Sequence, residues 1–232
     1  MTAAVHHERV RVGDAELAVA VRGTGEAVLL HPSLGRWAHD FDLLADALAD
    51  AGYQSLALDP RGVGASAGGL DGLTLPRCSE DIVAVLGHLG IGAAHLVGHA
   101  LGNRIVRQAA TLWPEVTRTV ILLAAGGRVP GDPEATRAVA RCFELDLPHD
   151  ERMGAVALAF FAPGNDPGVW VDGWYPAAAG AQGQASMASS STGWWEGGAG
   201  PMLVVQGLQD RVAPPANGRD LAANRTGPTG VL

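Results

Sequence analysis

The sequence predicts an α/β fold with a mostly parallel central sheet and helices on both of its faces. Several short runs are apolar without alternation, which is typical of strands buried on both faces, and segments of helical periodicity separate them. An alternating pair of segments precedes them and predicts an antiparallel edge. With 232 residues, 47% of them hydrophobic, the chain is long enough to bury a sizeable core.

The elements follow in order along the chain. The alternating strands are predicted at 9–12 and 16–21 with a turn at Gly13, and the apolar strands at 27–30, 54–58, 94–98, 118–124 and 202–206. Helices are predicted at 40–51, at 74–89 and through 103–110. In the first helix we expect Phe41, Leu44 and Leu48 to face the core.

The pattern changes between residues 126 and 200. Glycine and proline interrupt this segment, and four tryptophans fall in it, at 170, 174, 194 and 195. A disordered linker is the alternative, but the aromatic content favours a segment that packs or covers a pocket. We therefore expect one discontinuous core domain, 1–125 and 201–232, with an inserted cap or lid at 126–200.

Composition excludes several classes of function. The net charge of −8 disfavours nucleic-acid binding, which needs a basic patch. The chain has no lysine, so Schiff-base chemistry is excluded. Its two cysteines and the absence of a signal-peptide pattern near Met1 predict a cytoplasmic protein without a disulfide framework. No apolar run is long enough to span a membrane, and no cluster suggests a metal site or another cofactor.

The segment Gly98-His99-Ala100-Leu101-Gly102 carries the main functional signal. It lies between an apolar strand and a helical stretch, as does the nucleophile elbow G-x-S-x-G, in which two glycines permit a strained turn under an exposed serine. Here the central residue is Ala100, whose methyl group cannot act as a nucleophile.

Three further segments occur in the matching order. They are Asp59-Pro60-Arg61-Gly62-Val63-Gly64-Ala65-Ser66 after the strand at 54–58, His31-Pro32-Ser33-Leu34-Gly35 after the strand at 27–30, and Gln206-Gly207-Leu208-Gln209-Asp210-Arg211-Val212-Ala213-Pro214 after the strand at 202–206. Together with the elbow, they resemble the loops of the α/β-hydrolase superfamily over nearly the whole chain. The resemblance implies an α/β-hydrolase fold and the hydrolysis of small esters, lactones or carbamate-like acyl compounds, without a cofactor.

The resemblance also implies roles for individual residues. Ala100 stands at the nucleophile position and Asp210 at the position of the acid that orients a histidine. The backbone N–H groups of Leu101 and Ser33 would form the oxyanion hole, which does not require a side chain. His31, Leu34 and His99 are candidates for substrate contact.

Most of these polar side chains also have a structural interpretation. His99 is expected to pack beneath the site rather than replace the base, and His31 to hold the oxyanion loop. Ser33 is expected to act through its backbone rather than as a displaced nucleophile. Asp59 and Arg61 are expected to pair with each other and fix their loop.

No histidine follows Asp210, although in the superfamily the catalytic histidine follows the acid. We expect residues 226–232 to begin the last strand, and we interpret the chain as truncated before the histidine loop. The elbow also resembles that of the aminoacrylate or carbamate hydrolases of pyrimidine catabolism, which carry alanine at the same position. Two functions stay open: hydrolysis of a small acyl compound, and non-catalytic binding of a small molecule on the same fold. Oligomeric state and substrate identity are not predicted.

Overall fold

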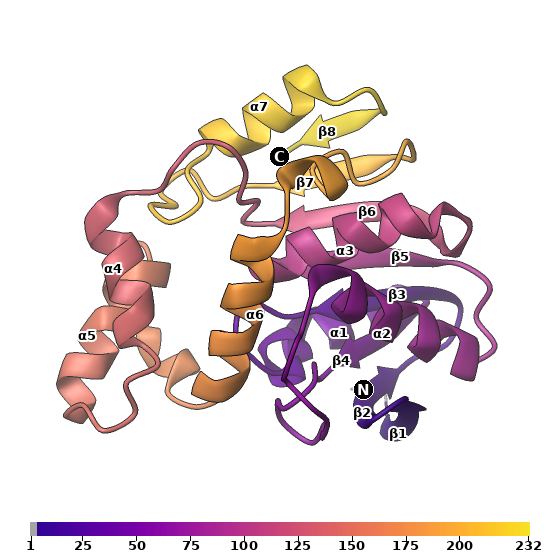
Figure 1. Cartoon of the computed structure of the whole chain (residues 1–232), viewed down its shortest axis with the longest axis horizontal. Coiled ribbons are helices and arrows are strands. Elements are labelled where there is room, and N and C mark those ends of the chain that lie inside the picture. Colours follow the sequence, from indigo (N-terminus) through magenta and orange to yellow (C-terminus); the bar gives the residue numbers. More distant parts are fainter. Residues whose placement is uncertain (1–3) are drawn as a thin grey trace.

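The computed structural model describes residues 4–232 and contains a twisted eight-stranded sheet (Figure 1). The strand order is β1-β2-β4-β3-β5-β6-β7-β8. All pairs from β4 onward are parallel, while β1 pairs antiparallel with β2 and β2 with β4. The strands are β1 (Val5–Val12), β2 (Ala15–Arg22), β3 (Glu26–His31), β4 (Tyr53–Leu58), β5 (Ala94–His99), β6 (Thr117–Leu123), β7 (Met202–Val205) and β8 (Thr229–Val231).

The predicted strands are confirmed, with ends that move by a few residues. The turn between β1 and β2 contains Gly13 at φ +59°, a left-handed conformation that favours glycine. Residues 229–231 pair in parallel with β7, so the segment expected to begin another strand does form one.

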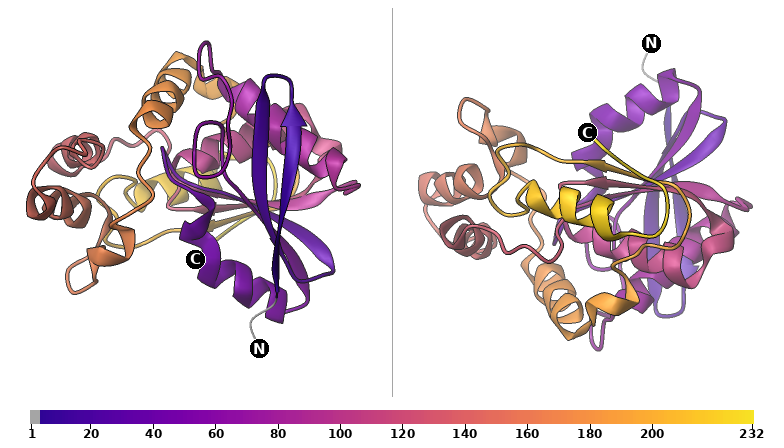
Figure 2. Two further views of the ribbon diagram at one scale, coloured as in Figure 1. Left: turned by 90° about the horizontal axis from the view of Figure 1, so that it is seen from below. Right: turned by 90° about the horizontal axis from the view of Figure 1, so that it is seen from above.

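The helices divide between the two faces of the sheet (Figure 2). They are α1 (Asp42–Asp50), α2 (Leu75–His88), α3 (Leu101–Leu112), α4 (Pro133–Arg141), α5 (His149–Phe160), α6 (Pro176–Ala188) and α7 (Ala216–Asn224). Alternate residues of β3 show the division: Leu29 packs in the same cluster as α2 and α3, whereas Leu30 packs with α1.

One detail of α1 differs from the expectation. Phe41 is buried in the short 3₁₀ turn Ala38–Phe41 before the helix, but Leu44 is 36% exposed. The fully buried position of the helix is Ala45, because a small residue lets α1 approach the sheet closely. The prediction for Leu44 was therefore wrong.

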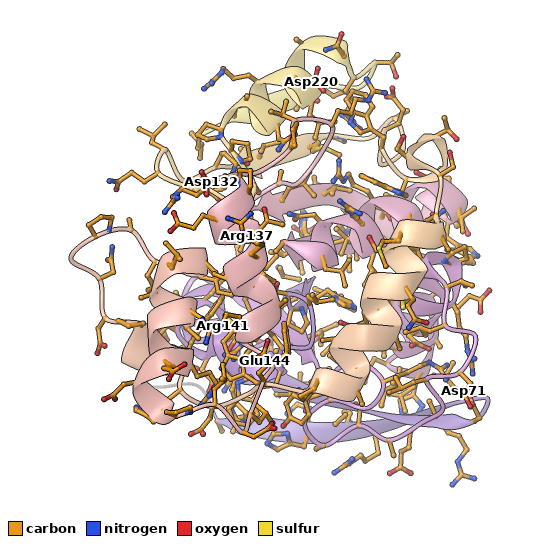
Figure 3. The ribbon with its side chains drawn as sticks, turned by 60° about the vertical axis from the view of Figure 1, so that its left-hand side comes forward. Asp71, Asp132, Arg137, Arg141, Glu144 and Asp220 are labelled. Carbon is orange, nitrogen blue, oxygen red and sulfur yellow. The ribbon has the colours of Figure 1, made fainter. Side chains whose placement is uncertain are left out.

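Helices α4, α5 and α6 follow β6 and precede β7. The first two lie beside each other at one end of the molecule, and α6 lies between them and the sheet (Figure 1). Helix α4 begins at an aspartate cap, since Asp132 accepts hydrogen bonds from the N–H groups of Glu134 and Ala135. Four charged residues lie in α4 or next to its ends: Asp132, Arg137, Arg141 and Glu144 (Figure 3).

The tryptophans of this segment pack in two different places. Trp174 is buried in a small cluster with residues of α4 and α5, and Trp170 packs against that cluster. Trp194 and Trp195 are buried instead in the main core, together with α3. Within residues 4–232, no helix is long and apolar enough to cross a membrane.

Candidate active site

The turn between β5 and α3 has the strained geometry of an elbow. Ala100 adopts φ +49° and ψ −105°, which a residue with a Cβ rarely does. The flanking glycines allow the close backbone contacts: a Cβ on Gly98 would lie 2.5 Å from the carbonyl oxygen of Gly102, and one on Gly102 would lie 2.4 Å from that of His31. The second non-glycine residue at positive φ within residues 4–232, Ala124 (φ +55°), follows the neighbouring strand.

Two backbone N–H groups near Ala100 are not used by the protein. Within residues 4–232, neither Leu101, the first residue of α3, nor Ser33 donates its N–H to a protein acceptor. The N–H of Ala100 itself is taken by the carbonyl of Leu123, at 3.0 Å. Asn103 strengthens this link, because its Nδ2 donates to the carbonyls of Leu123 and Ala124, each at 3.0 Å.

The loop that carries Ser33 is held in place by α6. The N–H of Gly35 donates to Oε1 of the buried Gln182 at 2.8 Å, and the carbonyl of Gly35 accepts from the N–H of Tyr175 at 3.0 Å. A Cβ on Gly35 would lie 2.7 Å from both Ala179 and Phe143. The segment between β6 and β7 therefore fixes the backbone around Ser33, as preorganised donors require.

Asp59 and Arg61 do not pair with each other, contrary to the prediction. Asp59 accepts from the N–H groups of Ala38 (2.8 Å) and Ala65 (2.9 Å). Arg61 binds both oxygens of Asp81 at 2.7 Å and also Asp14. Adjacent carboxylate and guanidinium groups suggest a pair in the sequence, but the intervening turn directs them to opposite sides of their loop.

Asp210 lies in the loop after β7. Its Oδ1 accepts from the N–H groups of Val212 (3.0 Å) and Ala213 (2.7 Å), while Nε2 of Gln206 lies 3.4 Å from Oδ2. Burial raises the pKa of Asp210, and the two N–H donors oppose that shift in part. Gln206 also bonds Ala213 and Ala125, so it connects this loop to the end of β6.

Two adjoining cavities meet at Ala100. The first, of about 330 Å³, contains His99, Ala100 and Asp210 with aromatic residues of the segment between β6 and β7. The second, of about 450 Å³, contains Ser33, Leu34, Ala100, Leu101 and Arg104. Ala124, Phe160, Val212 and Ala213 line both. The structure thus brings together six of the seven site residues named from the sequence.

His31 is the residue that the structure does not bring to these cavities. It is buried, with Nδ1 3.0 Å from the carbonyl oxygen of Pro32, and it borders a separate small space beside Arg61 and Asp81. Burial lowers its pKa to about 4. This position fits a residue that holds the loop and not one that contacts a substrate.

His99 borders the first cavity and packs edge-on against Trp170, with ring centroids 5.8 Å apart. Burial, and secondarily the charge of Arg36, lower its pKa to about 4. The imidazole is therefore neutral at pH 7 and weakly basic.

Sequence reasoning missed several residues that shape the cavities. Arg104 and Phe160 line them, and Gln182 holds the loop of Ser33. Arg104 occurs one helical turn after Ala100, a spacing that could have identified it. The contributions of Phe160 and Gln182 depend on how the segment between β6 and β7 packs, which no local pattern encodes. Among residues 4–232, no group of three or more potential metal ligands is found.

Comparisons with known proteins agree with this architecture. Residues 26–226 match the family model of the alpha/beta hydrolase fold. A RutD protein of Variovorax paradoxus (strain S110), named as a carbamate hydrolase, is 36% identical over 53% of this chain and 44% of its own length. The 2-(acetamidomethylene)succinate hydrolase of Mesorhizobium japonicum is 31% identical over 50% of this chain and 41% of its own length.

Among solved structures, the enol-lactonase from Burkholderia xenovorans LB400 superposes with a TM-score of 0.72 at 22% identity, over 97% of this chain and 91% of that one. The sequence matches span less than half the length of the curated relatives reported above. The family model covers most of the chain. The chain therefore belongs to the alpha/beta hydrolase fold family.

Proposed function

We propose that this protein hydrolyses small acyl compounds, such as esters, lactones or carbamate-like substrates, by direct attack of water. The observation that carries the proposal is the pair of unused N–H groups, of Leu101 and Ser33, on residues that line one cavity with Ala100. Such donors stabilise the negative charge that develops on a carbonyl oxygen. The names of the relatives, a carbamate hydrolase and a 2-(acetamidomethylene)succinate hydrolase, support the same reaction class.

The proposed route involves no covalent intermediate with the protein, because Ala100 has no hydroxyl. The oxygen of a water molecule bonds to the carbonyl carbon, and the carbonyl π electrons move to the oxygen held by the two N–H groups. Asp210 takes one proton from the attacking water. When the tetrahedral intermediate collapses, the bond to the leaving group breaks and that proton passes to the leaving group, which regenerates the carboxylate.

Asp210 is assigned as the base because of its position and its basicity. It borders the same cavity as Ala100, and burial raises its pKa from the ordinary aspartate value. His99 borders that cavity too, but with a pKa of about 4 and no carboxylate partner it resembles a packing residue more than a base. Oxyanion stabilisation and binding alone give roughly 10³-fold over water in other hydrolases, so we expect slow turnover of activated substrates.

The test is hydrolysis of a panel of small esters, lactones and carbamates by the full chain. Asp210→Asn should lower kcat by about tenfold or more, in line with general-base contributions, while leaving KM nearly unchanged. Asp71→Asn is the matched control, because Asp71 is an exposed aspartate that borders neither cavity. No turnover above the buffer rate for any member of the panel would contradict the proposal.

The second candidate is a non-catalytic binding protein. The methyl side chain of Ala100 favours it, since the serine route is chemically closed at this position. Saturable binding of panel members, measured by calorimetry, without any turnover would identify this second function.

A further inference from the structure

One guanidinium in the second cavity is not paired with any acid. Arg104 lies on α3, one turn after Ala100, and lines the cavity with Ser33 and Leu101. Within residues 4–232, no carboxylate oxygen lies within 4.0 Å of it. By contrast, the buried Arg36 and Arg61 each form an ion pair with an aspartate.

The other contacts of Arg104 fix its position but leave hydrogen-bonding capacity. Nη1 donates to Oγ of Ser186 on α6, and the guanidinium lies over the ring of Trp194, 4.9 Å from its centroid. Within the described residues, Nε and Nη2 of Arg104 make no hydrogen bond to the protein, and both atoms are partly exposed. These N–H groups are therefore accessible to solvent, and Arg104 lines the cavity.

The surroundings add positive potential. Arg107, fully buried one turn further along α3, also lies over Trp194 and donates only to carbonyl groups, those of Asn103, Trp195 and Gly126. Burial lowers the pKa of Arg107 to about 9, and the positive charge of Arg104 adds to the effect. A partly desolvated cation with no counter-charge is costly, and an anionic ligand would offset that cost.

We infer that Arg104 binds the carboxylate of the substrate, so that the site takes small acyl compounds carrying a carboxylate group. The position of the reacting carbonyl rests on the proposed hydrolase function, whereas the binding of a carboxylate by Arg104 does not. Leu101 and Arg104 lie three residues apart on α3, roughly 4.5 Å along the helix axis. A short molecule can therefore place its reacting carbonyl at Leu101 and its carboxylate at Arg104.

The shape of the second cavity fits this arrangement. Three apolar residues of the segment between β6 and β7, Val139, Phe143 and Phe160, also line it, and Ser186 provides a hydroxyl next to Arg104. The volume of about 450 Å³ accommodates a small molecule. Helix α6, which carries Ser186, lies between the α4–α5 pair and the sheet (Figure 1).

The test separates binding from turnover with matched probes. N-methylglutaramic acid has one carboxylate and one amide, and N,N′-dimethylglutaramide has the same chain without the charge. Calorimetry should show that the wild-type chain binds the acid at least tenfold more tightly, as expected for hydrogen bonds to a charged group. Raising the salt concentration should weaken binding of the acid and leave binding of the diamide unchanged.

The variants assign this preference to one residue. Arg104→Gln should remove the preference for the acid, and Arg104→Lys should retain part of it, because lysine keeps the charge but loses the planar fork. Arg137→Gln is the matched control, since Arg137 is an exposed arginine of α4 (Figure 3) that does not line the cavity. Thermal unfolding of each variant shows whether it is folded.

The outcomes distinguish the two proposals. Equal binding of acid and diamide by the wild-type chain would overturn the inference even if Arg104→Gln fails to fold. A preference that survives in folded Arg104→Gln would also overturn it and leave Arg104 as a packing partner of Trp194. An Arg104-dependent preference without turnover of any member of the substrate panel, monomethyl glutarate included, would support the inference while contradicting the proposed hydrolysis.

Discussion

Arg36 binds Asp40 through two parallel hydrogen bonds, Nε to Oδ2 at 2.8 Å and Nη2 to Oδ1 at 2.6 Å, and both side chains are almost completely buried. The guanidinium also lies over the rings of Trp170 and Trp174 and donates to the carbonyl of Asp172. This ion pair therefore connects the loop of Ser33 to the segment between β6 and β7.

Asp40→Asn should lower the free energy of unfolding by about 3–5 kcal/mol, because it leaves the Arg36 charge buried without its partner. Urea denaturation measures the change. Glu151→Gln provides the control, since it breaks an ion pair with Arg141 that is half exposed on both sides and should cost at most about 1 kcal/mol. Similar losses in the two variants would show that the buried pair has no special importance for stability.

The elbow gives a second stability prediction. Gly102→Ala should destabilise the protein by more than about 2 kcal/mol, because the new Cβ would lie 2.4 Å from the carbonyl oxygen of His31 and 2.7 Å from that of Pro32. Gly87→Ala, also within a helix but with open space around the Cβ, should stabilise by roughly 0.5–1 kcal/mol. Chemical denaturation of both variants tests the contrast. An unchanged free energy of unfolding in Gly102→Ala would mean that the backbone of α3 and of the loop after β3 can move apart at little cost.

Local patterns identified most of the fold and part of the site. Gly98 and Gly102 predicted the strained turn because both positions lie too close to other backbone atoms for a Cβ. The two glycines fall within five residues, so the pattern is visible in the local sequence. Leu44 was placed wrongly because hydrophobic periodicity identifies the apolar face of a helix but not how closely the sheet packs; Ala45 takes the central position.

Partner choice and cavity lining were harder to predict. Arg61 pairs with Asp81, which is 20 residues away, and not with Asp59, because the fold brings α2 beside the loop. The spacing of Arg104 from Ala100 could have placed it near the site, but its lack of a carboxylate partner within residues 4–232 is visible only once the neighbours are in place. Such features depend on contacts between distant segments, which a single sequence does not reveal.

The two histidines with lowered pKa predict how stability depends on pH. The pKa of His31 and of His99 falls from 6.5 to about 4 on folding, so the unfolded chain binds more protons between these values. The contribution of the two neutral histidines to the free energy of unfolding is fully present above about pH 6.5 and is lost as the pH falls toward 4. For the fully buried His31 the loss is on the order of 3 kcal/mol.

Denaturation midpoints at pH 7 and pH 5 provide the measurement. His31→Gln and His99→Gln should each reduce the loss of stability between the two pH values. His88→Gln serves as the control, because His88 is exposed on α2. An unchanged pH dependence in both buried-site variants would contradict the assigned environments of the two imidazoles.

Ala100→Ser restores a hydroxyl at the strained position but should not create a fast serine esterase. A serine hydroxyl needs a neighbouring base, and His99, which borders the first cavity, has a pKa of about 4. Mixed with p-nitrophenyl acetate, the variant should release p-nitrophenol without a burst, and its intact mass should show no acetyl adduct. Ala100→Gly is the control for acylation at other sites.

If a burst and an adduct are found in Ala100→Ser alone, the cavity does contain a competent base. Adding Asp210→Asn then shows which one it is: loss of the burst would identify Asp210 as the base for serine as well as for water, whereas an undiminished burst would assign that role to His99 and contradict the proposed water mechanism.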